Sequence, residues 1–432
     1  MSSPFRLLVA VAALALAAAA AVDGWRTFPY LLRMDFYHMW GVPLAHDTLA
    51  ANPYAQVREY GDLLNEVTVR SASPLLKRAN NARRVIEPTG TPFYYAVFGV
   101  LPRDFDAAAA VFCIAQYAAL FAAMVLLARL NGGSAWLGVA LAGVVALDFN
   151  PFAQDVKYGN VNAFQLLWIA GLMGLSAYRA RLPPFAFRDA FPALLAALAM
   201  FKPNTLWIVA LLAFHYVAVA GRGAILRGFL AGAIAAAVCA GVGAAYFDGP
   251  AAWHDWLHYT QGMNGGRLLY NVGEGNHAVV KLLAEASPRL GVMASELLLT
   301  ALLLAAFSFA LVKGRSDAPP RARVTGLLGD VQFAASCGVV LMLATSPLIW
   351  PHYDVLALVP IAWLLAGHAG RFGIACAALA CAALASPVIA LLVSDHFAWV
   401  RIMTLFCWVP LAAGMIAAGA IAANQGARVK IP

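Results

Sequence analysis

Long apolar runs recur along this chain and constrain its fold more than any other feature. The first run, FRLLVAVAALALAAAAAV at 5–22, includes Arg6 and is followed by Asp23. A helix needs roughly 20 such residues to cross a hydrocarbon core of about 30 Å. Of the 432 residues 62% are hydrophobic and 12% are charged, whereas soluble domains are about 25% charged. The sequence therefore predicts a multi-pass helical membrane protein. It excludes a soluble enzyme, a disulfide-stapled secreted domain and a disordered chain.

The runs predict an all-α polytopic bundle of about twelve transmembrane helices, a single membrane-embedded domain over 1–432. An uncleaved first helix is favoured over a signal peptide, because many more spans follow and none needs a removable leader. The predicted spans are 5–22, 107–128, 134–149, 161–178, 190–203, 204–220, 228–247, 291–312, 329–346, 353–368, 370–394 and 399–422. The alternative of one kinked helix over 190–220 would move everything after it to the other side of the membrane.

The positive charges test which side each loop occupies, because cytoplasmic loops are enriched in Lys and Arg. The net charge is +8, but the cations are strung out between apolar runs, which argues against a nucleic-acid face. With both termini cytoplasmic, the inner loops hold Arg129, Arg179, Arg181, Arg188, Arg222, Arg227, Lys313, Arg315, Arg321, Arg323, Arg371, Arg428 and Lys430. The large loops at 23–106 and 248–290 then face outward, which for a bacterial inner membrane is the periplasm.

The first outer loop, 23–106, is too polar and irregular to lie in hydrocarbon, where unpaired backbone groups are costly. Within it, 31–41 and 52–67 are predicted to form short interfacial helices. The segment 91–102 has too few apolar residues to span, so we expect it to be re-entrant or interfacial.

Asp35, in RMDFYHMW, is the strongest candidate for chemistry. A carboxylate flanked by Tyr37 and Trp40 would be partly desolvated, which favours a general-base role near neutral pH. The aromatic neighbours could stack on a sugar ring or anchor the helix at the headgroups. The alternative is an interfacial helix whose aspartate merely faces water.

Lys202, in the FKPN turn between two apolar segments, is the second candidate. A lysine at that depth is usually paired or functional, and it could neutralise a phosphate. The alternative is a lysine that snorkels to the surface at a hairpin turn. Asn160 and Asn162, at the start of a predicted helix, offer amide donors to an anion, although helix capping accounts equally well for Asn160.

Two later outer segments add polar side chains. His352, in SPLIWPHYD, could donate to a phosphate oxygen or could simply face the headgroups. His254 and His258 could share a helix face as metal ligands, but no third ligand is evident and zinc is not favoured. The glycine-rich loop 248–290 is plausible as a lid over an acceptor, and its candidates are Arg267, Glu274, Asn276 and His277.

The sequence lacks the motifs of several other kinds of chemistry. The six cysteines lie in apolar segments without metal-ligand or disulfide spacing. Neither a P-loop nor a Rossmann fingerprint is present, so no nucleotide-driven pump or nucleotide-sugar domain is visible.

The order of the motifs resembles glycosyltransferase family 87, the polyprenyl-phosphate-mannose-dependent mannosyltransferases with the GT-C architecture. The motifs carrying this resemblance are Asp-Phe-x-x-x-Trp from Asp35, Asn-Pro-Tyr from Asn52, TPFYY from Thr91, Gly-Asn-Val-Asn from Gly159, Phe-Lys-Pro from Phe201, an Asn-rich loop, and a late S-P-x-x-W-x-H ending at His352.

The resemblance implies an inverting transfer of a hexose, mannose by preference, from a polyprenyl-phosphate donor to a hydroxyl of a glycolipid or glycan acceptor. Asp35 matches the family's first-loop acid, the expected base. Lys202 and His352 would meet the leaving phosphate, with Asn160, Asn162 and Arg267 in support. Neither a cofactor nor a metal ion is expected, and membrane lipids are the only other partners.

Two other functions remain as alternatives. A transporter or flippase of lipid-linked sugars should show related halves with polar groups near the midplane, and the sequence shows no such symmetry. An outer-face polysaccharide polymerase or ligase would rely on arginines in a large late loop, whereas here the acidic residue lies in the first loop.

Overall fold

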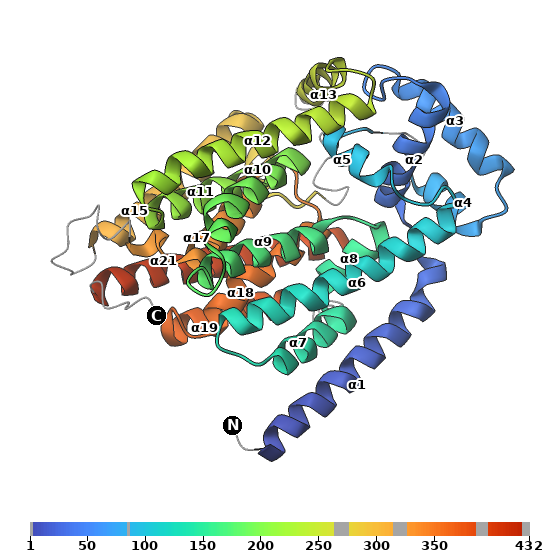
Figure 1. The fold of residues 1–432 in the computed structure, drawn as a ribbon. Coiled ribbons are helices and arrows are strands. Elements are labelled where there is room, and N and C mark those ends of the chain that lie inside the picture. Colours follow the sequence, from blue (N-terminus) through green and yellow to red (C-terminus); the bar gives the residue numbers. More distant parts are fainter. Residues whose placement is uncertain (1–2, 84–86, 263–275, 314–325, 386–395, 426–432) are drawn as a thin grey trace.

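The computed structural model of this protein describes all residues except 1–2, 84–86, 263–275, 314–325, 386–395 and 426–432 (Figure 1). The described residues form helices joined by short connections, and they contain no β-strand beyond one isolated bridge between Phe149 and Ala385. The predicted all-helical class is therefore confirmed.

Most of the helices form an apolar bundle. Its helices are α1 (Ser3–Thr27), α6 (Phe105–Leu130), α7 (Ala135–Asp148), α9 (Asn162–Ala177), α10 (Phe191–Phe201), α11 (Leu206–Val219), α12 (Arg222–Tyr246), α15 (Gly291–Lys313), α17 (Val331–Thr345), α18 (Leu358–Leu365), α19 (Gly370–Leu384) and α21 (His396–Gln425). Four described segments are long and apolar enough to cross a membrane: Arg6–Tyr30, Phe105–Leu130, Arg222–Tyr246 and Gly291–Phe309. The other bundle helices are shorter, so the count of about twelve spans stays a prediction.

The predicted break between two segments near residue 203 is present. α10 ends at Phe201, Lys202 adopts an extended conformation, and the short helix η3 (Pro203–Thr205) leads into α11. Proline has no backbone N–H, which explains why the helical ladder stops here. The helix that contains the next predicted span, 228–247, begins earlier, because α12 starts at Arg222 and so carries two arginines in its first turns.

Short helices from the first outer loop gather as a cap at one end of the bundle (Figure 1). They are α2 (Met34–Leu49), α3 (Val57–Arg70), α4 (Pro74–Ala82) and α5 (Pro92–Phe98), joined by α13 (Ala251–Gly262). The predicted helices at 31–41 and 52–67 correspond to α2 and α3, although both end later than predicted. The seven residues of α5 are too few to span, as predicted for 91–102.

The remaining elements are short helices in the connections between these helices. They are η1 (Phe28–Tyr30), α8 (Asn150–Tyr158), the π-helical turn η2 (Ala186–Ala190), α14 (Val279–Ala286) and η6 (Pro351–Ala357). Within the bundle α1 packs on α7, α6 on α9, α10 on α12, α11 on α17 and α19 on α21.

Large apolar side chains on the outside of the bundle face outward. Leu7 on α1, Phe229 on α12 and Leu297 on α15 are 67%, 73% and 64% exposed. A surface this apolar would be unstable against water but suits lipid tails. The cap, in contrast, packs around an aromatic core that it shares with the start of α6, in which Phe36 packs against Phe105 and Phe112.

Candidate active site

Asp35 lies in the first turn of α2, and the start of that helix is bound to α8. The backbone N–H groups of Leu32 and Arg33 both donate to Lys157 O, at 3.1 and 2.8 Å. Arg33 is left-handed, with φ of 52°, which turns the chain into α2 directly after this contact. The position of the acid is therefore set by the bundle and not only by its own loop.

Gly159 permits the close approach of α8 to α2. It has φ of +72°, and a Cβ built there would lie 2.6 Å from Phe36 Cβ. Only glycine combines the left-handed conformation with so little space. The tight turn it makes places the next residue, Asn160, beside Asp35.

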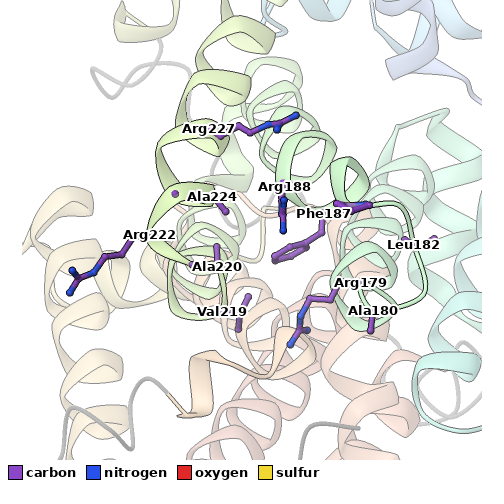
Figure 2. Close-up of a pocket in the computed structure, with 13 residues that line it drawn as sticks. Arg179, Ala180, Leu182, Phe187, Arg188, Val219, Ala220, Arg222, Ala224 and Arg227 are labelled. Atoms are coloured by element: carbon purple, nitrogen blue, oxygen red, sulfur yellow. The ribbon is translucent and has the colours of Figure 1, made fainter.

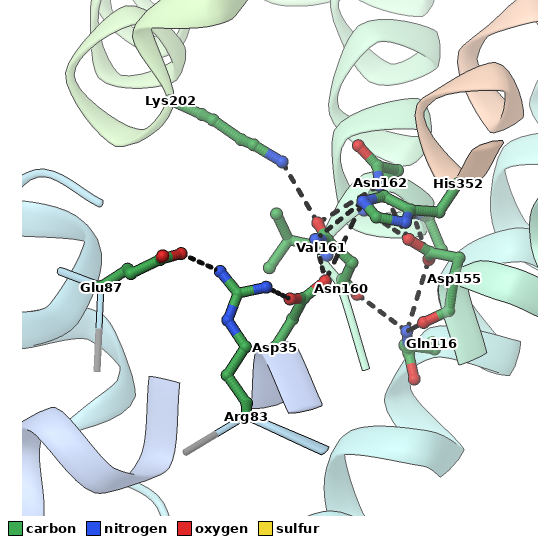
Figure 3. A network of polar contacts seen from close by, with 11 residues as sticks. Asp35, Arg83, Glu87, Gln116, Asp155, Asn160, Val161, Asn162, Lys202 and His352 are labelled. Atoms are coloured by element: carbon green, nitrogen blue, oxygen red, sulfur yellow. Dashed lines mark hydrogen bonds and ion pairs between the residues drawn. The ribbon is translucent and has the colours of Figure 1, made fainter. Parts of the chain in front are cut away.

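Asn160 is the centre of the polar contacts at this junction (Figure 3). Its Nδ2 donates to Asp35 Oδ2 at 2.9 Å and lies 3.1 Å from His352 Nε2. Its Oδ1 accepts from Lys202 Nζ at 3.2 Å and from the backbone N–H of Val161 at 2.7 Å. Because donors surround Oδ1, the amide nitrogen is directed toward the carboxylate and the imidazole. Side chains from three other parts of the chain thus converge on the amide of Asn160.

Asp155 is buried in the second half of α8 and binds the turn that carries Asn160. It accepts hydrogen bonds from Asn162 Nδ2 at 2.8 Å and from the backbone N–H groups of Asn162 and Ala163, both at 3.2 Å. Burial raises the pKa of Asp155 to about 6. Gln116 donates to Asp155 Oδ2 at 3.3 Å and to Asn160 O at 2.8 Å. Asn162 therefore supports the turn and does not face Asp35.

Arg83 forms an ion pair with the other oxygen of Asp35, with 3.7 Å between its Nη1 and Oδ1. The same guanidinium bonds Glu87, so it is shared by two carboxylates. The side chains of Asp35, Arg83 and Glu87 are 19%, 19% and 15% exposed. Asp35 is thus partly desolvated but not sealed, as a base that meets an incoming substrate requires.

Lys202 and His352 lie on the bundle side of Asp35. His352 Nε2 is 4.0 Å from Asp35 Oδ2, and Lys202 Nζ is 4.8 Å from the centre of the Tyr353 ring. The buried Nδ1 of His352 has no hydrogen-bond partner among the described residues. The site therefore offers one carboxylate facing a lysine and an imidazole whose other nitrogen is uncommitted.

The two aromatic candidates next to Asp35 are buried in the cap. Tyr37 and Trp40 are 1% and 4% exposed. Tyr37 Oη donates to Asn80 Oδ1 at 3.2 Å, and Trp40 Nε1 donates to Pro102 O at 3.1 Å. Both side chains stabilise the packing of α2 against the rest of the cap.

The candidates from the loop 248–290 divide into two groups. Asn276 Oδ1 accepts from the N–H of Ile349 at 3.0 Å, and His277 Nε2 is 3.3 Å from Asp354 Oδ2. Asn276 and His277 thus bind the segment around η6, which carries His352. Arg267 and Glu274 lie outside the described residues.

Five residues of the network were not singled out from the sequence: Arg33, Arg83, Glu87, Gln116 and Asp155. Asp155 stands in the same polar segment as Asn160, and that shared segment was a usable signal. Arg33 is fully buried and donates to Gln116 Oε1 at 3.0 Å across the sequence, a pairing that no local pattern indicates.

The described residues contain no group of three His, Cys, Asp or Glu side chains placed to hold a metal ion. The rings of His254 and His258 lie 4.6 Å apart on α13. The prediction of a metal-independent site stays a prediction.

Residues 88–347, more than half of the chain, match the model of glycosyltransferase family 87. The match includes Asn160 and Lys202, whereas Asp35 and His352 lie outside it. Comparison with curated proteins and with solved structures gave no match.

Proposed function

The chain belongs to glycosyltransferase family 87, and from this premise we propose how it acts. It is an integral-membrane, inverting glycosyltransferase. It transfers a hexose, mannose by resemblance, from a polyprenyl-phosphate donor to a hydroxyl of a glycolipid or glycan acceptor. Membership of the family supports the transferase activity, and the helical bundle supports the membrane setting.

One observation carries the proposed roles. Asp35, Asn160, Lys202 and His352 come from four separate elements and meet at a single amide. A carboxylate beside two nitrogen groups is the arrangement that a base and a departing phosphate require. Lys202 and Asp35 do not form a structural salt bridge with each other, because Lys202 Nζ donates to the amide oxygen of Asn160 and not to the carboxylate.

Asp35 is the proposed general base. The acceptor hydroxyl oxygen attacks the anomeric carbon of the donor sugar, and its proton passes to a carboxylate oxygen of Asp35. The bond between the anomeric carbon and the phosphate oxygen breaks as the new bond forms, with its electron pair leaving on the phosphate. Asn160 holds Oδ2 in place through its 2.9 Å hydrogen bond.

Lys202 and His352 are the proposed phosphate contacts. Charge develops on the leaving polyprenyl phosphate, and donors fixed beforehand stabilise such charge most effectively. Lys202 supplies a positive charge, and the uncommitted Nδ1 of His352 supplies a further hydrogen-bonding position. The protein's own donors can thus meet a monophosphate leaving group.

The bundle accounts for the lipid carrier. A polyprenyl tail can reach the site laterally from the bilayer, since the exposed outer surfaces of the helices are apolar. We place the site on the periplasmic side of a bacterial inner membrane with about twelve spans and both termini in the cytoplasm. The arginine-rich ends of α9 to α12, opposite the cap, support this orientation.

The proposal is tested with purified protein and Asp35→Asn. Labelled polyprenyl-phosphate mannose is the donor, and membranes from cells lacking this protein supply the acceptor. We expect the variant to fold and to lose transfer, because an amide cannot accept the proton. Asp62→Asn is the matched control, since Asp62 is an acid on the neighbouring helix α3 and is 74% exposed. It should retain full activity.

Three results would contradict the proposal. Near-normal turnover by Asp35→Asn would remove Asp35 from the role of base. Transfer from a nucleotide sugar in membranes free of polyprenyl phosphate would show that the donor is not lipid-linked. Donor movement across a bilayer without a glycosylated product would indicate a flippase.

A further inference from the structure

An open pocket of about 680 Å³ lies at the end of the bundle opposite the cap. It is lined by the segment that follows α9, by η2, by the end of α11 and by the start of α12. α9 begins next to Asn160, and its 16 residues span about 24 Å. The pocket is therefore separated from Asp35 by the length of a bundle helix, and the proposed reaction does not use it.

All charged side chains that line this pocket are arginines. They are Arg179, Arg188, Arg222 and Arg227. Arg227 bonds Asp189 through both Nε and Nη2, so its charge is largely compensated. Figure 2 shows Arg179 and Arg188 beside Phe187 while Arg222 extends away. The charge of Arg188 has no ion-pair partner among the described residues.

Hydrogen bonds hold the walls of the pocket together. The Tyr216 hydroxyl lies 2.9 Å from Arg188 O and 2.8 Å from Ala224 O and shares its one proton between them, which ties η2 to α12. Arg179 Nη1 donates to Ser176 O at 3.0 Å, and its guanidinium lies 5.9 Å from the centre of the Phe187 ring. π-Helical turns such as η2 are frequent at functional sites. The first backbone N–H groups of α12 add a positive dipole end.

Apolar side chains surround the pocket on its outer side. Phe185 before η2 and Leu226 and Phe229 on α12 are 61%, 65% and 73% exposed. A soluble anion would gain nothing from them, whereas the acyl chains of a lipid would cover them. Basic pockets between transmembrane helices on the inner side are the usual form of anionic-lipid sites.

We propose that this pocket binds the phosphate headgroup of an anionic phospholipid, with Arg179 and Arg188 as the phosphate contacts. A guanidinium pairs with phosphate oxygens bidentately, which makes arginine suited to this role. The acyl chains then lie along α12, over the exposed side chains. A bound lipid would join α9, η2 and α12 at the face opposite the active site.

The test uses the full chain in detergent with three probes: dioleoyl phosphatidylglycerol, dioleoyl phosphatidylcholine and inorganic phosphate. Native mass spectrometry counts bound lipid, and Tm in mixed micelles reports stabilisation. We expect phosphatidylglycerol alone to give a one-to-one complex and a higher Tm. The double variant Arg179→Gln, Arg188→Gln should weaken that binding by about tenfold.

The matched control is the double variant Arg129→Gln, Arg181→Gln. These two arginines belong to the same predicted inner face and are exposed, but they do not line the pocket. Equal losses in both double variants would show diffuse attraction and overturn the proposal. It would also be overturned if phosphatidylcholine bound equally well, or if inorganic phosphate raised Tm as much as phosphatidylglycerol.

Discussion

Replacing Gly159 with alanine tests whether the contact between α8 and α2 positions the acid. Two penalties arise there. The residue has φ of +72°, a conformation that costs a non-glycine residue about 1–2 kcal/mol. The new Cβ would also lie 2.6 Å from Phe36 Cβ. Carbon atoms rest at about 3.5–4.0 Å, so α2 must retreat by about 1 Å.

The matched control is Gly132→Ala. Gly132 has φ of +77°, and a Cβ built there meets nothing within 4 Å. Gly132→Ala therefore carries the backbone penalty without the displacement. A shift of about 1 Å in a reacting group costs about 100-fold in rate, equivalent to about 2.7 kcal/mol. We expect the left-handed backbone conformation to cost both variants a comparable amount of stability. Only Gly159→Ala should also show the loss in transfer rate.

The assay is sugar transfer from polyprenyl-phosphate mannose, with Tm in detergent measured in parallel. The loss in Gly159→Ala should appear in kcat, because donor and acceptor still bind while the base is misplaced. If Gly159→Ala matched Gly132→Ala in both turnover and Tm, the contact between the turn and α2 would not position the acid, and the reasoning would be refuted.

Further predictions concern donor binding, proton linkage and orientation. Lys202→Ala should raise the donor KM more than the acceptor KM, and the reverse pattern in steady-state kinetics would contradict its role at the phosphate. Asp155 has its pKa raised to about 6 by burial, so the folded chain holds this proton more tightly than the unfolded chain. The stabilisation by this proton is complete below about pH 4 and is lost as pH rises through about 6. The difference in Tm between the unmutated protein and Asp155→Asn should therefore fall over that range. A difference that stays constant with pH would contradict the raised pKa of Asp155. In a chain without its native cysteines, Asp62→Cys should react with an impermeant maleimide in spheroplasts and Arg181→Cys only after permeabilisation. The opposite pattern would place the active site inside.

Features set by local chemistry could be predicted from the sequence. Lys202 and Pro203 interrupt an apolar run, and the helix ends there because proline offers no N–H. The position of Asp35 among aromatic residues predicted a partly desolvated carboxylate, and its side chain is 19% exposed. Asp35 meets Asn160 and His352 in the structure, and the sequence indicated this because all three lie in segments predicted to be on the same outer face.

Features set by distant partners could not be predicted in this way. Arg83 and Glu87 are four residues apart and read as an ordinary surface pair, yet Arg83 reaches Asp35. From the sequence, Tyr37 and Trp40 could stack on a sugar ring or anchor the helix at the headgroups; in the structure, packing of the cap buries both. The choice between a ring that binds ligand and one that fills a core depends on what packs against it.

The hydrogen bonds from Leu32 and Arg33 to Lys157 have a consequence for chimeric enzymes. Transplanting the first loop from another family member would bring a new acid but leave its amide partner and its anchoring carbonyl behind. The two stretches 32–36 and 155–162 therefore depend on each other structurally. A chimera should therefore exchange both stretches together, so that the acid keeps its amide partner and its anchoring carbonyl.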